Sequence, residues 1–206
     1  MKVQVPAETN VVPLHPKEIL SLLGDAPFQW WIAGGWAIDF FLGKQTRRHF
    51  DTDVAIARNS QLITQSHLRD WEFYSTKREK NGNIVLRKWK TADFLERDYP
   101  GVWARKSGET IWRFEFLFHE INNQTWTFRY DESVKHPLAK IGRVPPDNIP
   151  YLLPEIALLY KAARLRNVDE QDFQRVLPSL NQIQRRQLLL DLKNFQPNHP
   201  WIAILV

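Results

Sequence analysis

The sequence predicts an α+β protein, with a mixed, largely antiparallel sheet flanked by helices and followed by a C-terminal helical subdomain. Three observations lead to this fold class. Between residues 70 and 130, segments rich in aromatic and β-branched residues alternate with turn-like breaks, which is typical of strands. Residues 142–150, GRVPPDNIP, read as a Pro-rich linker. Beyond that linker, apolar residues recur at helical spacing.

The first 70 residues predict alternating helices and strands. The first is a helix over 16–23 ended by Gly24, followed by a buried strand over 28–33 and a Gly34–Gly35 turn. A short helix from Trp36 is then stopped by Gly43, and a half-buried strand covers 50–57. The last is a helix capped by Asn59 or Ser60 that runs to about Asp70.

The following 60 residues predict four or five strands. Their segments are WEFYSTK, NIVLRKW, GVWARK, TIWRFEFLF and QTWTFRY, with breaks at Asn81–Gly82–Asn83, Pro100–Gly101, Ser107–Gly108 and Asn122–Asn123.

Three helices are predicted after the linker. Pro154 suits the first helical position, a second helix starts near Asp169, and a third covers 181–195. Three parts are therefore expected: a core over 1–141, the linker over 142–150, and a helical subdomain over 151–206.

Composition limits the possible functions. The 206 residues contain no cysteine, which excludes a disulfide framework, a thiolate zinc site and a cysteine nucleophile. No apolar run reaches the length of a membrane span, so a soluble cytoplasmic protein without membrane contact is expected. The net charge of +5 suggests a polyanionic partner such as a nucleotide triphosphate or nucleic acid. A solvated basic surface explains the charge equally well.

The segment 31–57, WIAGGWAIDFFLGKQTRRHFDTDVAIA, carries the chemistry. Two glycines after a strand let backbone approach a ligand closely, and the amides that open the next helix can cradle a phosphate. Asp51 and Asp53 lie two apart on a strand, so their carboxylates point to one face. Mg²⁺ is suited to bridge such a pair with substrate phosphates. Alone, Gly-Gly could be a plain turn and Asp-x-Asp a solvated strand end, but their combination is more specific.

This segment resembles the signature of the DNA-polymerase-β-like nucleotidyltransferase superfamily, and most closely its aminoglycoside 2''-nucleotidyltransferase and lincosamide nucleotidyltransferase branch. The matching residues are Gly34, Gly35, Trp36, Ala37, Asp39, Gly43, Thr46, Arg47, His49, Asp51 and Asp53. Thr52 departs mildly from the usual aliphatic residue between the aspartates. The resemblance implies that 1–141 is a nucleotidyltransferase core.

The superfamily uses a third carboxylate on a later strand, and Glu115 in TIWRFEFLFHE is the candidate. An ionised carboxylate among phenylalanines is costly unless it is paired, and a metal could be its partner. The alternative is a salt bridge to Arg113. The resemblance leaves open whether Glu115 is a metal ligand or a general base.

The resemblance extends more weakly to 153–173, where related enzymes place a helix lysine on the nucleotide phosphates; Lys161 is the match. The alternative is an exposed helix lysine. Arg47 could also contact phosphates or brace the aspartates. Asp169 and Asp172 are expected to anchor helices through Arg164 or Arg166 rather than to touch substrate.

The resemblance implies a metal-dependent nucleotidyltransferase that uses Mg²⁺ and moves a nucleoside monophosphate to a hydroxyl of a small molecule such as an aminoglycoside-like antibiotic. The nucleotide donor is ATP, with AMP as the transferred group, or another nucleoside triphosphate. RNA or protein acceptors are not excluded. The alternative is a catalytically degenerate module that binds a nucleotide, RNA or a protein partner. The acceptor, the nucleotide and the oligomeric state are left open.

Overall fold

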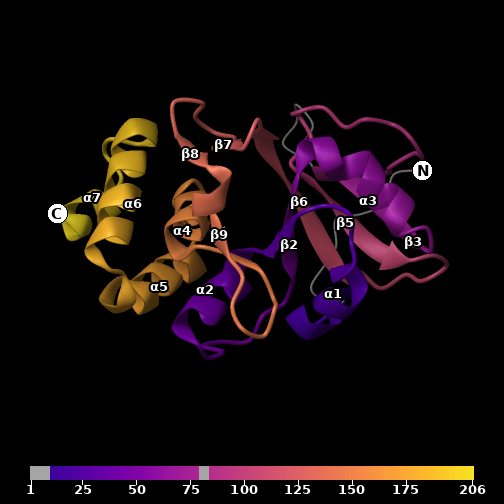
Figure 1. Ribbon diagram of the computed structural model, residues 1–206, viewed down its shortest axis with the longest axis horizontal. Helices are drawn as coiled ribbons and strands as arrows, with labels where there is room; N and C mark the ends of the chain where they lie inside the picture. The colour runs from indigo at the N-terminus through magenta and orange to yellow at the C-terminus, as the bar shows by residue number, and fades with distance from the viewer. Residues whose placement is uncertain (1–9, 79–83) are drawn as a thin grey trace. The chain divides into compact units, whose positions relative to one another are not determined.

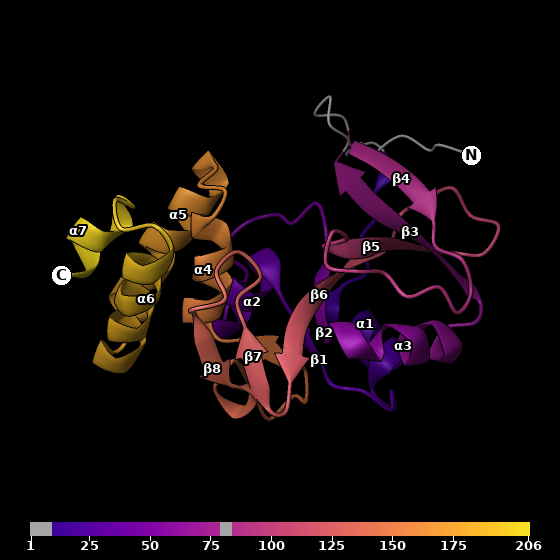
Figure 2. The same cartoon turned by 90° about the horizontal axis from the view of Figure 1, so that it is seen from above.

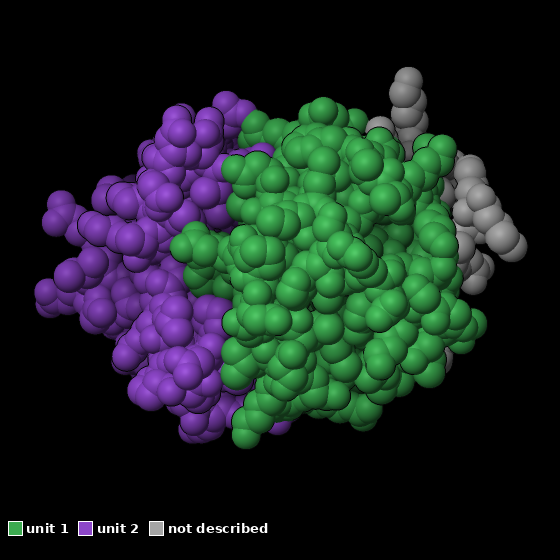
Figure 3. All heavy atoms as spheres, turned by 45° about the vertical axis from the view of Figure 1, so that its right-hand side comes forward, with its two compact units in different colours: residues 1–32, 48–118 green, residues 33–47, 119–206 purple. Residues whose placement is uncertain are grey.

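The computed structural model describes residues 10–78 and 84–206. It separates into two compact units, coloured separately in Figure 3: unit 1 is Met1–Ile32 with Arg48–Phe118, and unit 2 is Ala33–Arg47 with His119–Val206. None of the helices in the described ranges is long and apolar enough to cross a membrane. Figure 1 labels the elements of both units.

Unit 1 is built on strands that lie in the order β4-β3-β5-β6-β2-β1. Their bounds are β1 Trp30–Ile32, β2 Asp53–Ala57, β3 Trp71–Arg78, β4 Ile84–Lys88, β5 Gly101–Lys106 and β6 Phe114–Asn122. The pairs β1–β2, β3–β4, β3–β5 and β5–β6 are antiparallel. The expected strands are confirmed, while the turn expected at Asn81–Gly82–Asn83 lies outside the described residues.

Aromatic side chains cover both faces of this sheet. On β3, Phe73 packs toward Phe116, with ring centroids 6.0 Å apart. The next residue, Tyr74, points to the opposite face, where its ring lies 5.1 Å from that of Trp112. Phe116 and Trp112 are almost completely buried. The strand segments are therefore aromatic because each face buries its own apolar layer.

Helices α1 (Pro16–Leu23) and α3 (Gln61–His67) lie on the same side of strands β3, β4 and β5 in Figure 2, and Figure 1 shows that the two helices are apart from each other. The expected start of α1 at Pro16 is confirmed, and Gly24 follows its last residue. Ile19 and Leu23, one helical turn apart, are fully buried. The short 3-10 helix η2 (Arg58–Ser60) leads into α3.

The two glycines of the signature begin a helix rather than form a separate turn. Helix α2 covers Gly34–Leu42 in unit 2, so the expectation of a Gly34–Gly35 turn before a helix from Trp36 is wrong. Gly34 has a φ of 59°, which favours glycine because it has no Cβ. The expected end is confirmed, because Gly43 at φ 69° donates its N–H to the carbonyls of Asp39 and Phe40.

The rest of unit 2 consists of short strands and helices. Their bounds are β7 Thr125–Thr127, β8 Lys135–Pro137, η3 Leu138–Lys140, β9 Gly142–Arg143, β10 Tyr151–Leu152, α4 Pro154–Ala162, α5 Asn167–Val176, η4 Leu177–Ser179, α6 Gln182–Phe195 and α7 Trp201–Leu205. The end of β6 pairs with β7, β7 with β8, and β9 with β10. The three helices expected after the linker are confirmed as α4, α5 and α6.

The core of unit 2 is also aromatic. Phe173 on α5 stacks on Trp201 of α7, with centroids 4.2 Å apart and planes 6° from parallel. Phe128 packs against Tyr160 of α4 and Phe195 of α6, with centroids 5.0 and 5.1 Å away. Strand β9 begins the Pro-rich segment 142–150, and β10 follows it directly. The division at 142–150 stays a prediction about which segments fold independently.

Candidate active site

Asp51 and Asp53 are accessible on either side of a buried threonine. Thr52 is fully buried, and its Oγ1 donates to the carbonyl of Leu14 at 2.7 Å. Asp53 opens β2 and is half-buried, while Asp51, just before the strand, is exposed. Because side chains alternate along extended backbone, the anchored threonine directs the two carboxylates to the other side. The sequence placed both aspartates on the strand, whereas β2 begins at Asp53 and Asp51 precedes it.

Glu115 lies on the strand beside this segment. Its backbone N–H donates to the carbonyl of Thr52 at 2.9 Å, and β6 neighbours β2 in the sheet. Its Cα pairs with that of Trp103 on β5. Glu115 is half-buried, whereas Phe114 and Phe116 are fully buried on the opposite face. The premise that Glu115 sits among the phenylalanines is therefore wrong, although its strand borders the two aspartates.

The start of α2 has the properties of an anion-binding helix end. The first intrahelical hydrogen bond runs from the Ala37 N–H to the Ala33 carbonyl at 3.2 Å. The N-cap residue, Ala33, has a methyl side chain and cannot cap the earlier amides. Gly34 and Gly35 are the first helical residues, so a ligand can approach their N–H groups closely.

Lys161 and Arg47 meet at one buried carboxylate in unit 2. The Lys161 ammonium lies 2.8 Å from Asp172 and 3.2 Å from Asp169. Arg47 donates from Nε and Nη2 to the two oxygens of Asp172, both at 3.0 Å. The side chain of Lys161 is 7% exposed, so the alternative of an exposed helix lysine is wrong.

Two further arginines complete this charge cluster, which consists of Arg47, Lys161, Arg166, Asp169, Asp172 and Arg175. Arg166 donates to Asp169 at 2.8 Å, as expected from the sequence, and Arg175 donates to Asp172 at 3.0 Å. Within this cluster, four basic side chains pair with the two buried carboxylates.

The cations decide the ionisation of both aspartates. Burial alone would raise the pKa of Asp172, but hydrogen bonding from Arg47 and the charge of Lys161 outweigh it, and the pKa is lowered. The pKa of Asp169 is lowered in the same way, with Arg166 and Lys161 opposing burial. Both carboxylates are therefore ionised at neutral pH.

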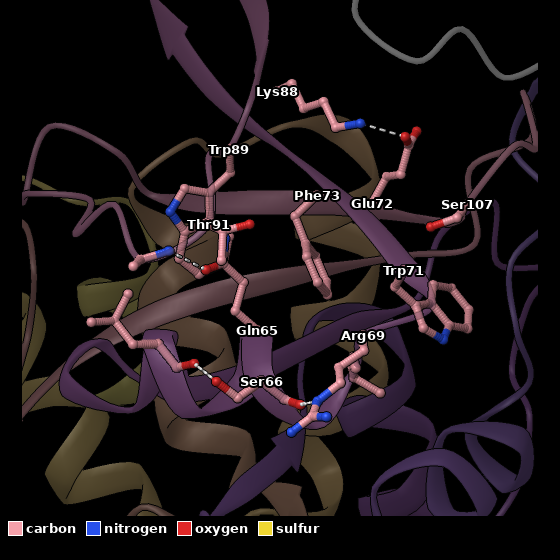
Figure 4. Close-up of a pocket in the computed structure, with 13 residues that line it drawn as sticks. Gln65, Ser66, Arg69, Trp71, Glu72, Phe73, Lys88, Trp89, Thr91 and Ser107 are labelled. Atoms are coloured by element: carbon pink, nitrogen blue, oxygen red, sulfur yellow. Dashed lines mark hydrogen bonds and ion pairs between the residues drawn. The ribbon is translucent and has the colours of Figure 1, made fainter.

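Unit 1 also contains a cavity of about 530 Å³ between α3 and the strands β3 and β4 (Figure 4). Trp71, Phe73 and Trp89 are part of its wall. Its polar groups bond to nearby protein groups: Ser66 donates to the carbonyl of Leu62, and the ammonium of Lys88 pairs with Glu72. Gln65 likewise bonds the loop that follows β4. None of the site residues expected from the sequence lines this cavity.

Possible metal ligands in the described residues occur at most as pairs rather than as larger groups. Within 10–78 and 84–206, no three histidine, aspartate or glutamate side chains are grouped in an arrangement that could hold a metal ion. Asp51 and Asp53 remain a pair of accessible carboxylates. A pair of this kind fits Mg²⁺, which commonly takes one or two carboxylates together with substrate phosphates.

Comparison with known proteins identifies the signature segment. Residues 16–93 match the family model of the aminoglycoside-2''-adenylyltransferases. This range includes Gly34, Gly35, Arg47, Asp51 and Asp53. The expected resemblance to the nucleotidyltransferase superfamily is confirmed. No curated protein matches the chain.

Two solved structures share the fold. One is the lincosamide antibiotic adenylyltransferase LnuA with lincomycin bound, at a TM-score of 0.51 and 18% identity, covering 80% of this chain and 96% of the other. The second is the antibiotic-resistance factor ANT(2'')-Ia, at a TM-score of 0.51 and 12% identity, covering 91% of this chain and 92% of the other. The expected nucleotidyltransferase fold is therefore confirmed.

Proposed function

We propose that this protein is a metal-dependent nucleotidyltransferase that moves AMP from ATP to a hydroxyl group of a small molecule. The observation that carries the proposal is the Asp51–Thr52–Asp53 segment. Its threonine is anchored in the core, its two carboxylates are accessible, and the strand beside it presents Glu115. The family match over 16–93 includes both aspartates and supports the same reaction class.

The proposed reaction is an in-line displacement at the α-phosphorus of ATP. The oxygen of the acceptor hydroxyl forms a bond to this phosphorus while the bond to the pyrophosphate oxygen breaks. The hydroxyl proton passes to Glu115 or to water, and pyrophosphate leaves with the electron pair of the broken bond. The products are the adenylylated acceptor and pyrophosphate.

Asp51 and Asp53 would hold Mg²⁺. Glu115 would act as the general base, or as a third ligand that joins the two aspartates only when the ion is bound, because the described residues include no ready group of three ligands. When bound, the ion neutralises triphosphate charge and orients the α-phosphoryl group. A carboxylate at position 115 suits either role, because it can coordinate oxygen-loving cations and can accept a proton. The Mg²⁺ dependence and the pH profile of a Glu115→Gln variant would distinguish the roles.

Gly34, Gly35, Arg47 and Lys161 are the proposed phosphate-binding residues. The amides of Gly34 and Gly35 open α2 at its positive end, which favours an anion. Arg47 and Lys161 belong to the cluster in which four basic side chains pair with Asp169 and Asp172. A planar guanidinium and a point-charge ammonium are both common partners of phosphate.

The acceptor is proposed to be an aminoglycoside-like or lincosamide-like antibiotic. The matched family takes its name from adenylyl transfer to the 2'' position of aminoglycosides, and LnuA is a lincosamide adenylyltransferase with lincomycin bound. Both acceptor classes are hydroxyl-bearing small molecules. The use of ATP would also suit the cytoplasmic location expected from the sequence.

The decisive experiment incubates the protein with Mg²⁺, α-labelled ATP and a panel of aminoglycosides and lincosamides. Labelled antibiotic and released pyrophosphate are expected from the wild type, with neither product from an Asp51→Asn, Asp53→Asn double variant. Nucleotide binding by calorimetry without transfer to any acceptor, RNA and protein included, would favour the degenerate binding module instead.

A further inference from the structure

Within unit 2, Arg47 is held to helix α5 by a contact with Asp172, which lies 125 residues later in the sequence. Its Nε and Nη2 donate to Oδ1 and Oδ2 of Asp172 at 3.0 Å each, which is the two-pronged pairing that fixes the plane of a guanidinium. Asp172 lies on α5 with 1% of its side chain exposed. A single hydrogen bond would leave the guanidinium free to rotate, whereas this fork sets its orientation.

The backbone around Arg47 is fixed independently of Asp172. Thr46 donates from its amide and its hydroxyl to Oδ1 of Asp39, at 3.1 and 2.5 Å. The side-chain amide of Gln45 donates to the carbonyl of Arg47 at 3.0 Å. Because the main chain has these anchors of its own, the contact with Asp172 acts mainly on the Arg47 side chain.

Asp169 provides an internal comparison. It lies on the same helix, its side chain is 0% exposed, and it also pairs with Lys161. Its arginine partner is Arg166, three residues earlier on the chain, and the Arg166 side chain is 58% exposed. Asp169 therefore braces the start of α5, while Asp172 reaches a residue four positions before Asp51 in sequence.

We propose that Asp172 is a positioning residue, which holds the Arg47 guanidinium in the orientation that binds the phosphates of the nucleotide. The inference rests on the proposed function. The two-pronged pairing supports it, because the two parallel hydrogen bonds fix the plane of the guanidinium. Asp172 touches no substrate in this proposal and acts through Arg47. Its contact with Lys161 is shared with Asp169, so an Asp169→Asn variant serves as the control for that contact.

The test is a double-mutant cycle on ATP affinity, measured by calorimetry on folded protein. Asp172→Asn and Arg47→Lys are each expected to weaken binding about tenfold, since each loses the fork. The double variant should also bind about tenfold more weakly than the wild type, because the second change removes nothing further. Combining Arg47→Lys with Asp169→Asn should instead give the product of the two separate effects.

The proposal is overturned if the effects of Asp172→Asn and Arg47→Lys multiply, because Asp172 would then act through overall stability alone. If Asp172→Asn does not fold, the ATP affinities of Arg47→Lys and Arg175→Lys are compared instead. Arg175 is the matched control, because it donates to the same carboxylate at 3.0 Å. Arg47→Lys is expected to lose about tenfold in affinity and Arg175→Lys less than about twofold. Equal losses would contradict positioning, and a folded wild type that binds no ATP would instead refute the proposed function.

Discussion

The chain carries two pairs of closely spaced aspartates in opposite surroundings. Asp51 and Asp53 are exposed and half-buried, and the residue between them is tied into the core. Asp169 and Asp172 are almost completely buried, and each is paired with at least two cations. Burial without partners would neutralise a carboxylate, so the second pair exists as ions only because of its cations.

The contrast is between an accessible pair and a buried pair whose charge is compensated by cations. A buried, fully paired carboxylate has no coordination position left for a metal, and breaking its pairs leaves uncompensated charge in the interior. An accessible carboxylate can lose its charge at little cost to stability. Substitutions in the two pairs should therefore affect different measurements.

The largest expected effect is on turnover, from Asp51→Asn or Asp53→Asn. Either change removes a ligand charge of the proposed metal, so transfer of labelled AMP should fall about 10³-fold or more. The melting temperature of Asp51→Asn should stay within about 2 °C of the wild type, because the side chain is exposed. Full activity in either variant would contradict the proposed metal-binding role of Asp51 and Asp53.

Glu115→Gln should lower turnover by about 10²–10⁴-fold. If Glu115 is the general base, the acidic limb of the pH–rate profile should disappear while the Mg²⁺ requirement is unchanged. If it is a metal ligand, the concentration of Mg²⁺ needed for half-maximal rate should rise. Unaltered kinetics would restrict the carboxylate site to Asp51 and Asp53.

Asp169→Asn should affect stability. At pH 7 we expect a loss of about 3–5 kcal/mol in the free energy of unfolding, measured in urea, because Lys161 and Arg166 lose a shared counter-charge. A loss below about 1 kcal/mol would show that the buried pair is dispensable.

The same variant should also change the response to acid. The pKa of Asp169 lies below its usual value of 3.8, so its stabilising contribution is present above that value and is lost as pH falls through the lowered pKa. The stability difference between wild type and Asp169→Asn should therefore shrink below about pH 4. A difference that is constant from pH 7 to pH 2 would contradict this origin.

The smallest effect tests a buried carboxylate without a strong cation partner. Burial raises the pKa of Glu155, opposed by a hydrogen bond from Gln184 and the charge of His136, while Asp191 adds to the rise. Because the pKa of Glu155 is higher in the folded than in the unfolded protein, the buried carboxyl favours folding below its unfolded-state pKa. It disfavours folding as the pH rises through the folded-state pKa. Glu155→Gln should therefore raise the melting temperature at pH 7 by about 2–4 °C per kcal/mol gained, and by less at pH 4.

Several elements followed from local sequence alone. Pro16 and Gly24 bracket α1, Gly43 ends α2, and Pro154 opens α4, because proline and glycine restrict or release particular backbone angles. The aromatic strands of unit 1 were also predictable, since aromatic and β-branched residues suit pleated, buried surfaces.

The sequence was less informative where long-range contacts decide. It predicted a turn at Gly34–Gly35, but the chain enters α2 directly through the positive φ of Gly34. It placed Glu115 among phenylalanines, but the alternation of β6 turns Phe114 and Phe116 to the opposite face. It gave no sign of β9 and β10, which have two residues each and exist only as a pair.

The sequence by itself determined the Asp-x-Asp segment, the glycines before it and the family resemblance, because these depend on residue type and short spacing. Only the tertiary structure decided which acidic residues are accessible and which are buried and paired with cations. Asp172 pairs with Arg47, which lies 125 residues earlier in the sequence, and neither periodicity nor propensity predicts a pairing at that sequence separation. Burial and charge compensation are properties of the folded chain, so they could be read only from the structure.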